Sequence, residues 1–445
     1  MFFCLGNFGI LYYMKKTFEF FLVLIIFYGV YSAFDSAAPV LFENPNGFWV
    51  IIVSLVVAAL ILVLYSFIIS SEVQLKMKKN IDELKSEIKQ KEQEVKKAKS
   101  FKEDLIAKAE QSKKIDYKPI SQIEGCKNTL TKTEMNGVSM VSISGQIDAT
   151  AYDPVKEINA TWVSIIPFGF IRSGESNVQY NLSWQWHGEK LEGTIESIAL
   201  AKAQGLKVFL KPHLWVHNVW VGDLEFTNET DWQTFESTYY DYIMEFAEVA
   251  DSMGVEAYCV GVELKKTVVP RAAFWNRLID SVKTVYSGKL TYAANWDNYE
   301  IVPFWNKLDY IGIDSYFPLS DSQTPSFEEC YAGWKDDYLK IKAKSETENK
   351  KVIFTEYGFR NVDYTGKEPW KSDRSMNVVN LEAQTNTTLA LFETFWNEDW
   401  FAGGFLWKWH HNYGKAGGEN NSRFTPQNKP AEVLIKEMYS KYSYF

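Results

Sequence analysis

The chain has 445 residues, of which 46% are hydrophobic and 16% aromatic, so it can bury a large core and carry an additional module. Its formal net charge of -9 argues against nucleic acid as a partner, because phosphate binding needs a concentrated basic surface. The four cysteines have neither metal nor disulfide spacing and give no indication of an oxidising compartment.

The first 70 residues contain two apolar segments, residues 20–34 and 48–70. The second segment is long enough to cross a bilayer as a helix, whereas the length of the first is marginal. We interpret residues 1–70 as a membrane anchor formed by an uncleaved helical hairpin, because the first segment ends in a poor signal-peptidase site. Translation can begin at Met1 or at Met14, which directly precedes two lysines.

Lysines flank the two apolar segments on their outer sides, whereas the loop between the segments has only Asp35 and Glu43 as charged residues. The positive-inside rule then places both ends of the hairpin on the cytoplasmic side of the plasma or inner membrane. The rest of the chain is expected on the same side. The flanking lysines are Lys15, Lys16, Lys76, Lys78 and Lys79.

Residues 71–111 are rich in lysine and glutamate and contain neither proline nor glycine, which predicts a helical stalk. Apolar residues at heptad-like spacing favour a coiled coil that would form a homo-oligomer, although Lys91 and Lys102 interrupt the seam. A single solvated helix that acts as a spacer is equally compatible with this pattern. Residues 112–135 are polar and are interpreted as a linker.

Strand-like and helix-like patterns alternate through residues 136–445 until eight strands are counted. This alternation predicts an α/β fold of the (β/α)8 TIM-barrel type. A doubly wound open sheet is disfavoured, because no glycine-rich phosphate-binding turn follows an early strand. The predicted strands lie near Val138, Ala160, Leu206, Val255, Lys289, Leu308, Lys351 and Ala402.

Two helices between these strands have clear end signals. One follows Glu192 and is expected to stop at Gly205. The other is expected to begin with an aspartate cap at Asp231 and to stop at Gly254.

Two predicted strands end in glutamate: Glu263 ends the fourth strand and Glu356 ends the seventh. Chemistry in an α/β barrel is placed at the carboxyl ends of the strands, and the fourth and seventh strands lie on opposite sides of the mouth. Glycoside hydrolysis uses two carboxyl groups across the scissile bond, roughly 5 to 5.5 Å apart in retaining enzymes. A structural salt bridge would explain either glutamate alone, but explains both together less well.

Six stretches, taken in order, are ATWVSIIPFGF, AKAQGLKVFLKPHLWV, GVEL, DYIGIDSYFPLS, FTEYGF and GGFLWKWH. Together they resemble the clan A glycoside hydrolases and, within that clan, the β-mannanases of glycoside hydrolase family 113. The resemblance implies a retaining hydrolase of β-linked glycans, above all β-1,4-mannan or manno-oligosaccharides, with no cofactor. It also implies that Glu263 is the acid/base and Glu356 the nucleophile. Many clan members have asparagine where this chain has Val262, so a contact to the sugar 2-hydroxyl must come from another side chain.

Several polar and aromatic residues fall near the predicted mouth. Tyr316 is expected to donate a hydrogen bond to Glu356, although it could also be a core tyrosine. Alternation along the eighth strand would let Trp407 and Trp409 share a face, and the resemblance implies that one of them, preferably Trp407, forms the stacking floor for the sugar. The predicted substrate-binding residues are Tyr316, His213, Trp215, Asn295, Trp296, Trp407 and Trp409, with His213 and Asn295 equally compatible with structural roles.

The histidines could suggest a metal centre, because His213 and His217 are four residues apart and His410 precedes His411. Spacing of four residues brings two ligands together on a helix, but this pair leaves a strand through a loop. No HExxH pattern occurs, so we predict no metal.

Three other functions use the same kind of scaffold. A catalytically silent carbohydrate-binding barrel at a membrane is disfavoured, because binding alone does not need paired carboxylates and Tyr316. A transglycosylase would share the covalent intermediate and would resolve it with a sugar instead of water. A metal hydrolase would lose activity with a chelator. Polysaccharide hydrolases commonly act outside the cell, whereas the flanking lysines indicate the cytoplasmic side of the membrane.

The predicted anchor can be tested by fractionation. We expect the full chain to sediment with membranes and to resist extraction by high salt, because two apolar helices would be inserted in the bilayer. A chain that lacks residues 1–70 should be released into the soluble fraction. Recovery of the full chain in the soluble fraction would contradict the anchor.

Overall fold

The computed structural model describes residues 78–79, 85–86, 89, 135–372 and 376–442 of the chain. The chain divides into two compact units, Met1–Lys114 and Ile115–Phe445. The anchor at residues 1–70, nearly all of the stalk and the linker lie outside the described residues, so the membrane and homo-oligomer assignments stay predictions. Within the described ranges, no helix has the length and apolar character needed to span a membrane.

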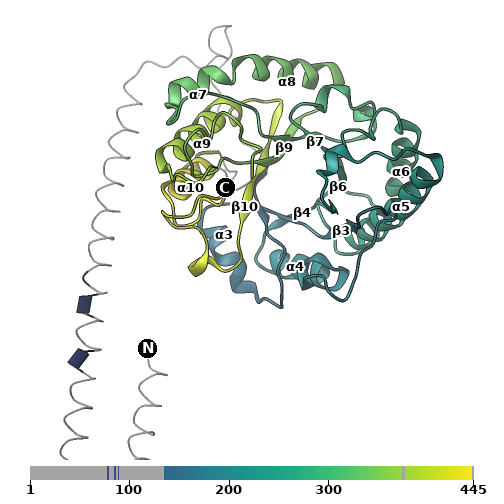
Figure 1. Cartoon of the computed structure of the whole chain (residues 1–445), viewed down its shortest axis with the longest axis horizontal. Helices are drawn as coiled ribbons and strands as arrows, with labels where there is room; N and C mark the ends of the chain where they lie inside the picture. Colours follow the sequence, from purple (N-terminus) through teal and green to yellow (C-terminus); the bar gives the residue numbers. More distant parts are fainter. Residues whose placement is uncertain (1–77, 80–84, 87–88, 90–134, 373–375, 443–445) are drawn as a thin grey trace, which may run out of the picture. The chain divides into compact units, whose positions relative to one another are not determined.

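Eight parallel strands close into a barrel, which confirms the predicted (β/α)8 fold (Figure 1). Around the barrel the order is β1-β10-β9-β8-β7-β6-β4-β2, so strands that follow one another in the chain are neighbours, and the last barrel strand pairs with the first. All carboxyl ends therefore meet at one mouth. The barrel strands are β1 (Met135–Met140), β2 (Trp162–Ile165), β4 (Lys207–Leu210), β6 (Ala257–Val262), β7 (Lys289–Asn295), β8 (Ile311–Ser315), β9 (Val352–Tyr357) and β10 (Phe401–Trp409).

Helices surround the barrel (Figure 1). The α-helices are α3 (Asp153–Glu157), α4 (Leu191–Ala203), α5 (Glu229–Ser252), α6 (Ala272–Val285), α7 (Phe327–Gly333), α8 (Lys335–Glu348), α9 (Leu381–Phe395) and α10 (Pro430–Tyr442). Short 3₁₀ helices are η2 (Ala149–Tyr152), η3 (His187–Glu189), η4 (Val221–Asp223), η5 (Tyr299–Ile301), η6 (Trp305–Lys307) and η7 (Tyr413–Lys415).

The two helices with predicted end signals are α4 and α5. Both end where expected, because Gly205 and Gly254 follow them with φ angles of 78° and 59° that favour glycine. The predicted cap of α5 is wrong. Its N-cap is Asn228, whose side-chain oxygen accepts a hydrogen bond from the backbone N–H of Asp231, so Asp231 already lies in the first turn.

Two predicted strands are each divided by a proline. Pro167 separates β2 from β3 (Phe168–Ile171), and Pro212 separates β4 from β5 (His213–Val216). Proline has no N–H to donate to a neighbouring strand, so a ladder is readily interrupted there. Beyond the prolines, β3 and β5 pair with each other in a separate two-stranded parallel sheet. His213 and Trp215 therefore lie on this extension and not on the barrel itself.

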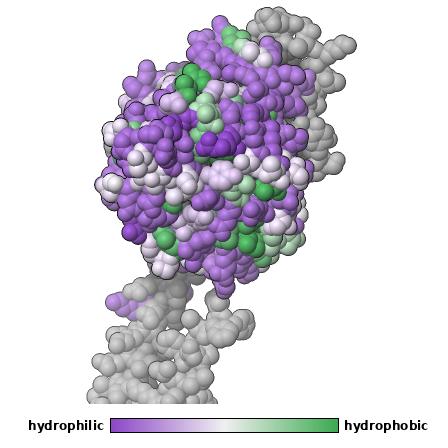
Figure 2. Space-filling view, turned by 90° about the vertical axis from the view of Figure 1, so that its right-hand side faces the viewer, coloured by the Kyte–Doolittle hydropathy of each residue, from purple (hydrophilic) through white to green (hydrophobic). Residues whose placement is uncertain are grey.

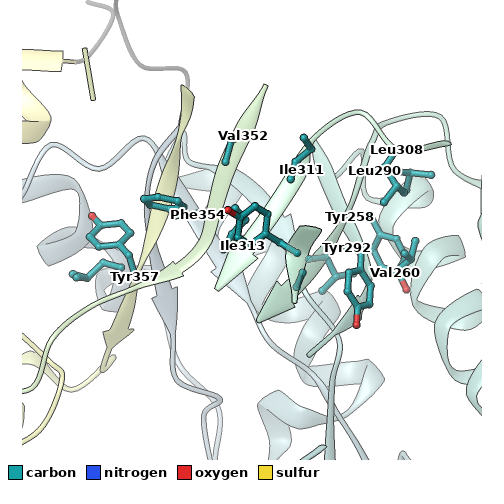
Figure 3. Close-up of a cluster of buried hydrophobic side chains, with 14 of the residues drawn as sticks. Tyr258, Val260, Leu290, Tyr292, Leu308, Ile311, Ile313, Val352, Phe354 and Tyr357 are labelled. Carbon is teal, nitrogen blue, oxygen red and sulfur yellow. The ribbon is translucent and has the colours of Figure 1, made fainter. Parts of the chain in front are cut away.

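Apolar side chains pack on both sides of the barrel wall. Alternate residues such as Tyr258 and Val260 in β6, or Ile311 and Ile313 in β8, belong to the core between strands and helices (Figure 3). The outer surface seen in Figure 2 is mostly polar, with small scattered apolar patches. A second, smaller cluster comes from the intervening positions and consists of Met135, Trp162, Phe209, Ala257, Cys259, Val262, Ala293, Ile353, Ala402 and Phe405.

Close packing of the wall can be tested at Gly312 in β8. A Cβ atom at this position would lie 2.3 Å from the backbone oxygen of Tyr292 in the neighbouring strand. Because a backbone atom in a closed barrel cannot move aside, Gly312→Ala should lower the free energy of unfolding by about 1 to 3 kcal/mol. Chemical denaturation would measure this. Gly145→Ala, where nothing lies within 4 Å, is the control and should be near neutral; equal stability of the two variants would contradict the packing argument.

Candidate active site

A β-bulge directs Glu356 toward the mouth of the barrel. Phe354 and Glu356 of β9 face Ile313 and Asp314 of β8, so β9 has one more residue than its neighbour at this point. Phe354 belongs to the core outside the wall, and strict alternation would turn Glu356 outward as well. The extra residue, Thr355, reverses this orientation. Glu356 thus lies at the end of the seventh barrel strand, as predicted.

Glu263 follows a second bulge. Cys259 and Val262 of β6 pair with Thr291 and Ala293 of β7, so β6 has one more residue than β7 at this point. Glu263 itself has a φ angle of 52°, in the left-handed region that few residues other than glycine adopt. Its backbone N–H donates to the oxygen of Ala293 at 2.8 Å. Backbone conformations of this kind are concentrated at functional sites.

A third bulge separates the two tryptophans of β10. Val138 and Met140 of β1 pair with Leu406 and Trp409, so β10 also contains one extra residue. The predicted alternation of Trp407 and Trp409 on one face is therefore wrong. Trp409 is 0% exposed and belongs to the outer core, which excludes it as a sugar contact in this conformation, whereas Trp407 is partly exposed.

Each oxygen of the Glu356 carboxylate has its own hydrogen-bond donor. Tyr316 donates to Oε2 at 2.6 Å, which is the hydrogen bond expected from the sequence. Lys211 donates to Oε1 at 2.7 Å. The Nε2 atom of His213 lies 3.5 Å from the same Oε1. The carboxylate is therefore fixed from two sides, and its orientation does not depend on a single contact.

Lys211 and Asp314 were not identified from the sequence. Both side chains are 0% exposed, and Lys211 Nζ lies 3.0 Å from Asp314 Oδ1. The hydroxyl of Thr355 donates to the same Asp314 oxygen at 2.7 Å. A signal was available: each is an ionisable residue within or directly after an apolar strand, and such residues are rarely buried unless they are paired.

Glu263 has a different environment. Its Oε2 accepts a hydrogen bond from Nε1 of Trp220 at 3.0 Å, and the residue is partly exposed. Burial of the carboxyl group raises the pKa of Glu263 to about 8, and the negative charges of Asp314 and Glu356 add to this rise. Trp220 is 42% exposed and lies in a loop after β5, so no pattern in the sequence marks it as a neighbour of Glu263.

The two glutamates differ in pKa. Burial and then the charge of Asp314 raise the pKa of Glu356 to about 7, while Lys211 and Tyr316 act in the opposite direction. Because the Lys211 cation and the Tyr316 hydroxyl both favour ionised Glu356, whereas Glu263 accepts from the neutral Trp220 indole, Glu356 loses its proton before Glu263. Two carboxyl groups that differ in this order can serve as a nucleophile and a proton donor at the same pH.

Aromatic rings extend from Glu356 along β5. His213 is stacked on Trp407 with a centroid distance of 5.9 Å and an angle of 3° between the rings. Burial, followed by the charges of Lys211 and Lys408, keeps the pKa of His213 well below 6.5, so the imidazole is neutral. Trp215 is 47% exposed and lies 5.8 Å from the ring of Phe170 in β3.

Asn295 and Trp296 lie at the end of β7, as expected. Asn295 is buried and donates from Nδ2 to Asp297 at 2.9 Å. Trp296 is partly exposed and stacks on Trp370 at a centroid distance of 5.0 Å. Asn295 is thus held by its own loop, and Trp296 forms an aromatic pair that the sequence did not indicate.

No group of three or more His, Cys, Asp or Glu side chains in the described part of the chain is arranged to hold a metal ion. His217 packs edge-on against Trp215 at 5.5 Å. The absence of a metal from the chemistry stays a prediction.

The sequence profile of Glycoside Hydrolase Family 113 matches residues 145–429, which include both glutamates and nearly the whole barrel. The chain belongs to this family. This hydrolase is similar to the family 113 β-mannanase AaManA from Alicyclobacillus acidocaldarius, solved in complex with ManMIm: the identity is 25%, the TM-score 0.61, and the match covers 70% of this chain and 98% of the other. A second solved family 113 β-1,4-mannanase shares the fold at 24% identity, with a TM-score of 0.59 and coverage of 69% and 99%. The comparison with curated proteins finds no match.

Membership of the family establishes that the protein is a glycoside hydrolase and that its substrate is a carbohydrate. The structure brings Glu356, Tyr316, His213 and Trp407 together at the mouth. The individual roles of these residues and of Glu263 stay predictions.

The pKa order predicts a bell-shaped dependence of kcat/KM on pH. Activity should fall below about 7, where Glu356 becomes protonated, and above about 8, where Glu263 loses its proton. Trp220→Phe removes a hydrogen bond that favours the ionised form of Glu263, so the alkaline limb should move to higher pH while the acidic limb stays in place. An alkaline limb that stays in place or moves down would contradict the assignment of Glu263.

Proposed function

We propose that this hydrolase cleaves β-1,4-mannan or manno-oligosaccharides with retention of configuration. The observation that carries the proposal is the pair of strand-end glutamates, Glu263 after β6 and Glu356 in β9, in environments that give them different proton affinities. Family membership and the similarity to the β-mannanase AaManA support the substrate.

In the first step, Glu263 donates its proton to the glycosidic oxygen as the bond from this oxygen to the anomeric carbon breaks. An oxygen of Glu356 attacks the anomeric carbon and forms a glycosyl ester. Tyr316 and Lys211 hold the attacking carboxylate in one orientation, which lowers the entropic cost of reaching the transition state.

In the second step, water attacks the anomeric carbon, Glu263 takes a proton from this water, and the carboxylate of Glu356 leaves. The ester intermediate has no charge on Glu356, so one of the charges that raise the pKa of Glu263 disappears. Glu263 then ionises more readily and can act as the base. The same residue thus serves as acid and base because the charge of its partner changes.

Trp407 and His213 provide the contacts expected of a sugar-binding floor. The partly exposed ring of Trp407 can stack on the apolar face of a pyranose. The Nε2 atom of His213 is buried and has no hydrogen-bond partner among the described residues. We propose that it binds a sugar hydroxyl, which would supply a polar contact that Val262 cannot make.

The proposal is tested by hydrolysis of β-mannan, glucomannan, cellulose and xylan oligosaccharides by the full chain. We expect new reducing ends from the mannans. Glu263→Gln and Glu356→Ala should each lower kcat/KM by about 10² to 10⁴-fold or more, because each removes a group that reacts. Glu300→Gln, a change at an exposed glutamate in η5, is the matched control and should leave the activity unchanged.

The products distinguish the remaining possibilities. NMR of the first-formed sugar should show the β-anomer, and the α-anomer would contradict retention. Longer products on addition of an acceptor sugar would indicate a transglycosylase. Binding without turnover of any β-glycan would indicate a carbohydrate-binding barrel and overturn the proposal.

A further inference from the structure

We propose that Lys211 is the positioning residue of the nucleophile: its ammonium group fixes one oxygen of Glu356 and is itself held by Asp314 and the backbone of Thr355. Its Nζ atom lies 2.7 Å from Glu356 Oε1, 3.0 Å from Asp314 Oδ1 and 3.4 Å from the oxygen of Thr355. An ammonium group has three protons, and three acceptors are present. The inference rests on the proposed role of Glu356.

The position of Lys211 follows from the barrel. Lys211 directly follows β4 and lies two residues after Phe209, which belongs to the smaller cluster of barrel side chains. Alternation therefore turns both side chains to the same side of the wall. Asp314 comes from β8 and Thr355 from the bulge in β9, so Lys211 connects strands that are not neighbours in the barrel.

The charges in this cluster do not balance. One ammonium group lies between two carboxyl groups, Asp314 and Glu356, and all three side chains are almost completely removed from solvent. Removal of Lys211 would leave two buried carboxyl groups without the ammonium group that both contact, and one of them would then hold a proton at neutral pH. Each carboxyl group would keep one hydrogen bond, Asp314 from Thr355 and Glu356 from Tyr316. Because burial raises the pKa of Glu356 to about 7 even with Lys211 in place, Glu356 is the group that we expect to be protonated. A protonated Glu356 cannot attack.

Lys211 also has a role in the second step. The charge returns to Glu356 as this carboxylate leaves the anomeric carbon, and a fixed cation beside Oε1 stabilises that developing charge. Both steps should therefore slow when the ammonium group is removed. Without Lys211, Oε2 of Glu356 still accepts the hydrogen bond from Tyr316. The variant therefore loses the positive charge beside Oε1, while Tyr316 still orients the carboxylate.

Other groups around Lys211 and Glu356 also contribute charge or titrate. Lys408 in β10 carries a positive charge that acts on Glu356, but its pKa is lowered by burial. Neutral His213 packs from β5, and Cys259 in β6 is kept as a thiol because burial raises its pKa to about 12. The titratable groups that face Lys211 and Glu356 are Asp314, Tyr316, Glu263, His213, Cys259 and Lys408.

The test compares the double variant Lys211→Met/Asp314→Asn with Asp314→Asn in the full chain, because the charge of Asp314 itself raises the pKa of Glu356 and must be absent from both. Lys211→Met alone leaves an unpaired buried carboxylate and can fail to fold, whereas the double variant removes that charge as well. The acidic limb of kcat/KM should lie about 1 to 3 pH units higher in the double variant than in Asp314→Asn, because a nearby cation no longer favours ionised Glu356. Lys202→Met is the control, since Lys202 also pairs with a carboxylate and a backbone oxygen. Its partners, Glu256 and Gly254, lie just before β6 and so at the amino end of the strands, opposite the mouth.

If the role of Lys211 were purely structural, its removal would lower activity at every pH and would leave the acidic limb in place. A folded double variant whose acidic limb coincides with that of Asp314→Asn would therefore overturn the proposal. So would Lys211→Arg/Asp314→Asn, if it folds and still shows the shift although its cation is retained.

A second measurement does not depend on turnover. The side-chain carboxyl carbons of glutamate can be labelled with ¹³C, and the signal of Glu356 can be assigned by its loss in Glu356→Gln. Its titration midpoint should be higher in the double variant than in Asp314→Asn, and it should stay in place in Lys202→Met. If the protein hydrolyses none of the β-glycans, the proposed function fails, and this titration still decides whether Lys211 controls Glu356. Equal midpoints in the double variant and in Asp314→Asn would overturn the inference.

Discussion

A buried ammonium group shared by two carboxyl groups connects the barrel to its chemistry. Lys211 pairs with Asp314 and Glu356 inside the wall, where water cannot compensate an unpaired charge. Because its partners come from β8 and β9 and the lysine follows β4, the pairing requires that the barrel be closed in the correct register. The interior therefore combines an apolar lower part with a polar end at which Glu356 is held between a lysine and a tyrosine.

Three bulges next to site residues provide the second constraint. They occur in β6, β9 and β10, which carry or precede Glu263, Glu356 and Trp407. Each adds a residue to one strand and reverses the orientation of the side chains that follow. Regular strands build a wall in which apolar residues alternate between the two faces, whereas the irregular ends turn polar side chains toward the mouth. The same strand can thus stabilise the core and present a reactive group.

The sequence was sufficient for the barrel, because eight apolar runs separated by helical patterns leave few alternatives. It also located Glu263, Glu356 and Tyr316 at strand ends, and the hydrogen bond from Tyr316 is present. It failed where local geometry breaks the period of two: a bulge separates Trp407 from Trp409, and prolines divide two strands. Contacts such as that of Trp220 with Glu263 join residues 43 positions apart through a loop, and no local pattern encodes them.

The divided strands have a consequence for how relatives of this protein can diverge. Pro167 and Pro212 interrupt the barrel ladder before β3 and β5 begin, and these two strands form a separate two-stranded sheet. An insertion or deletion within this ribbon would leave the register of the eight barrel strands intact. The later residues of the ribbon, such as Trp215, can therefore vary between relatives, whereas His213 at its base stays beside Glu356 and Trp407.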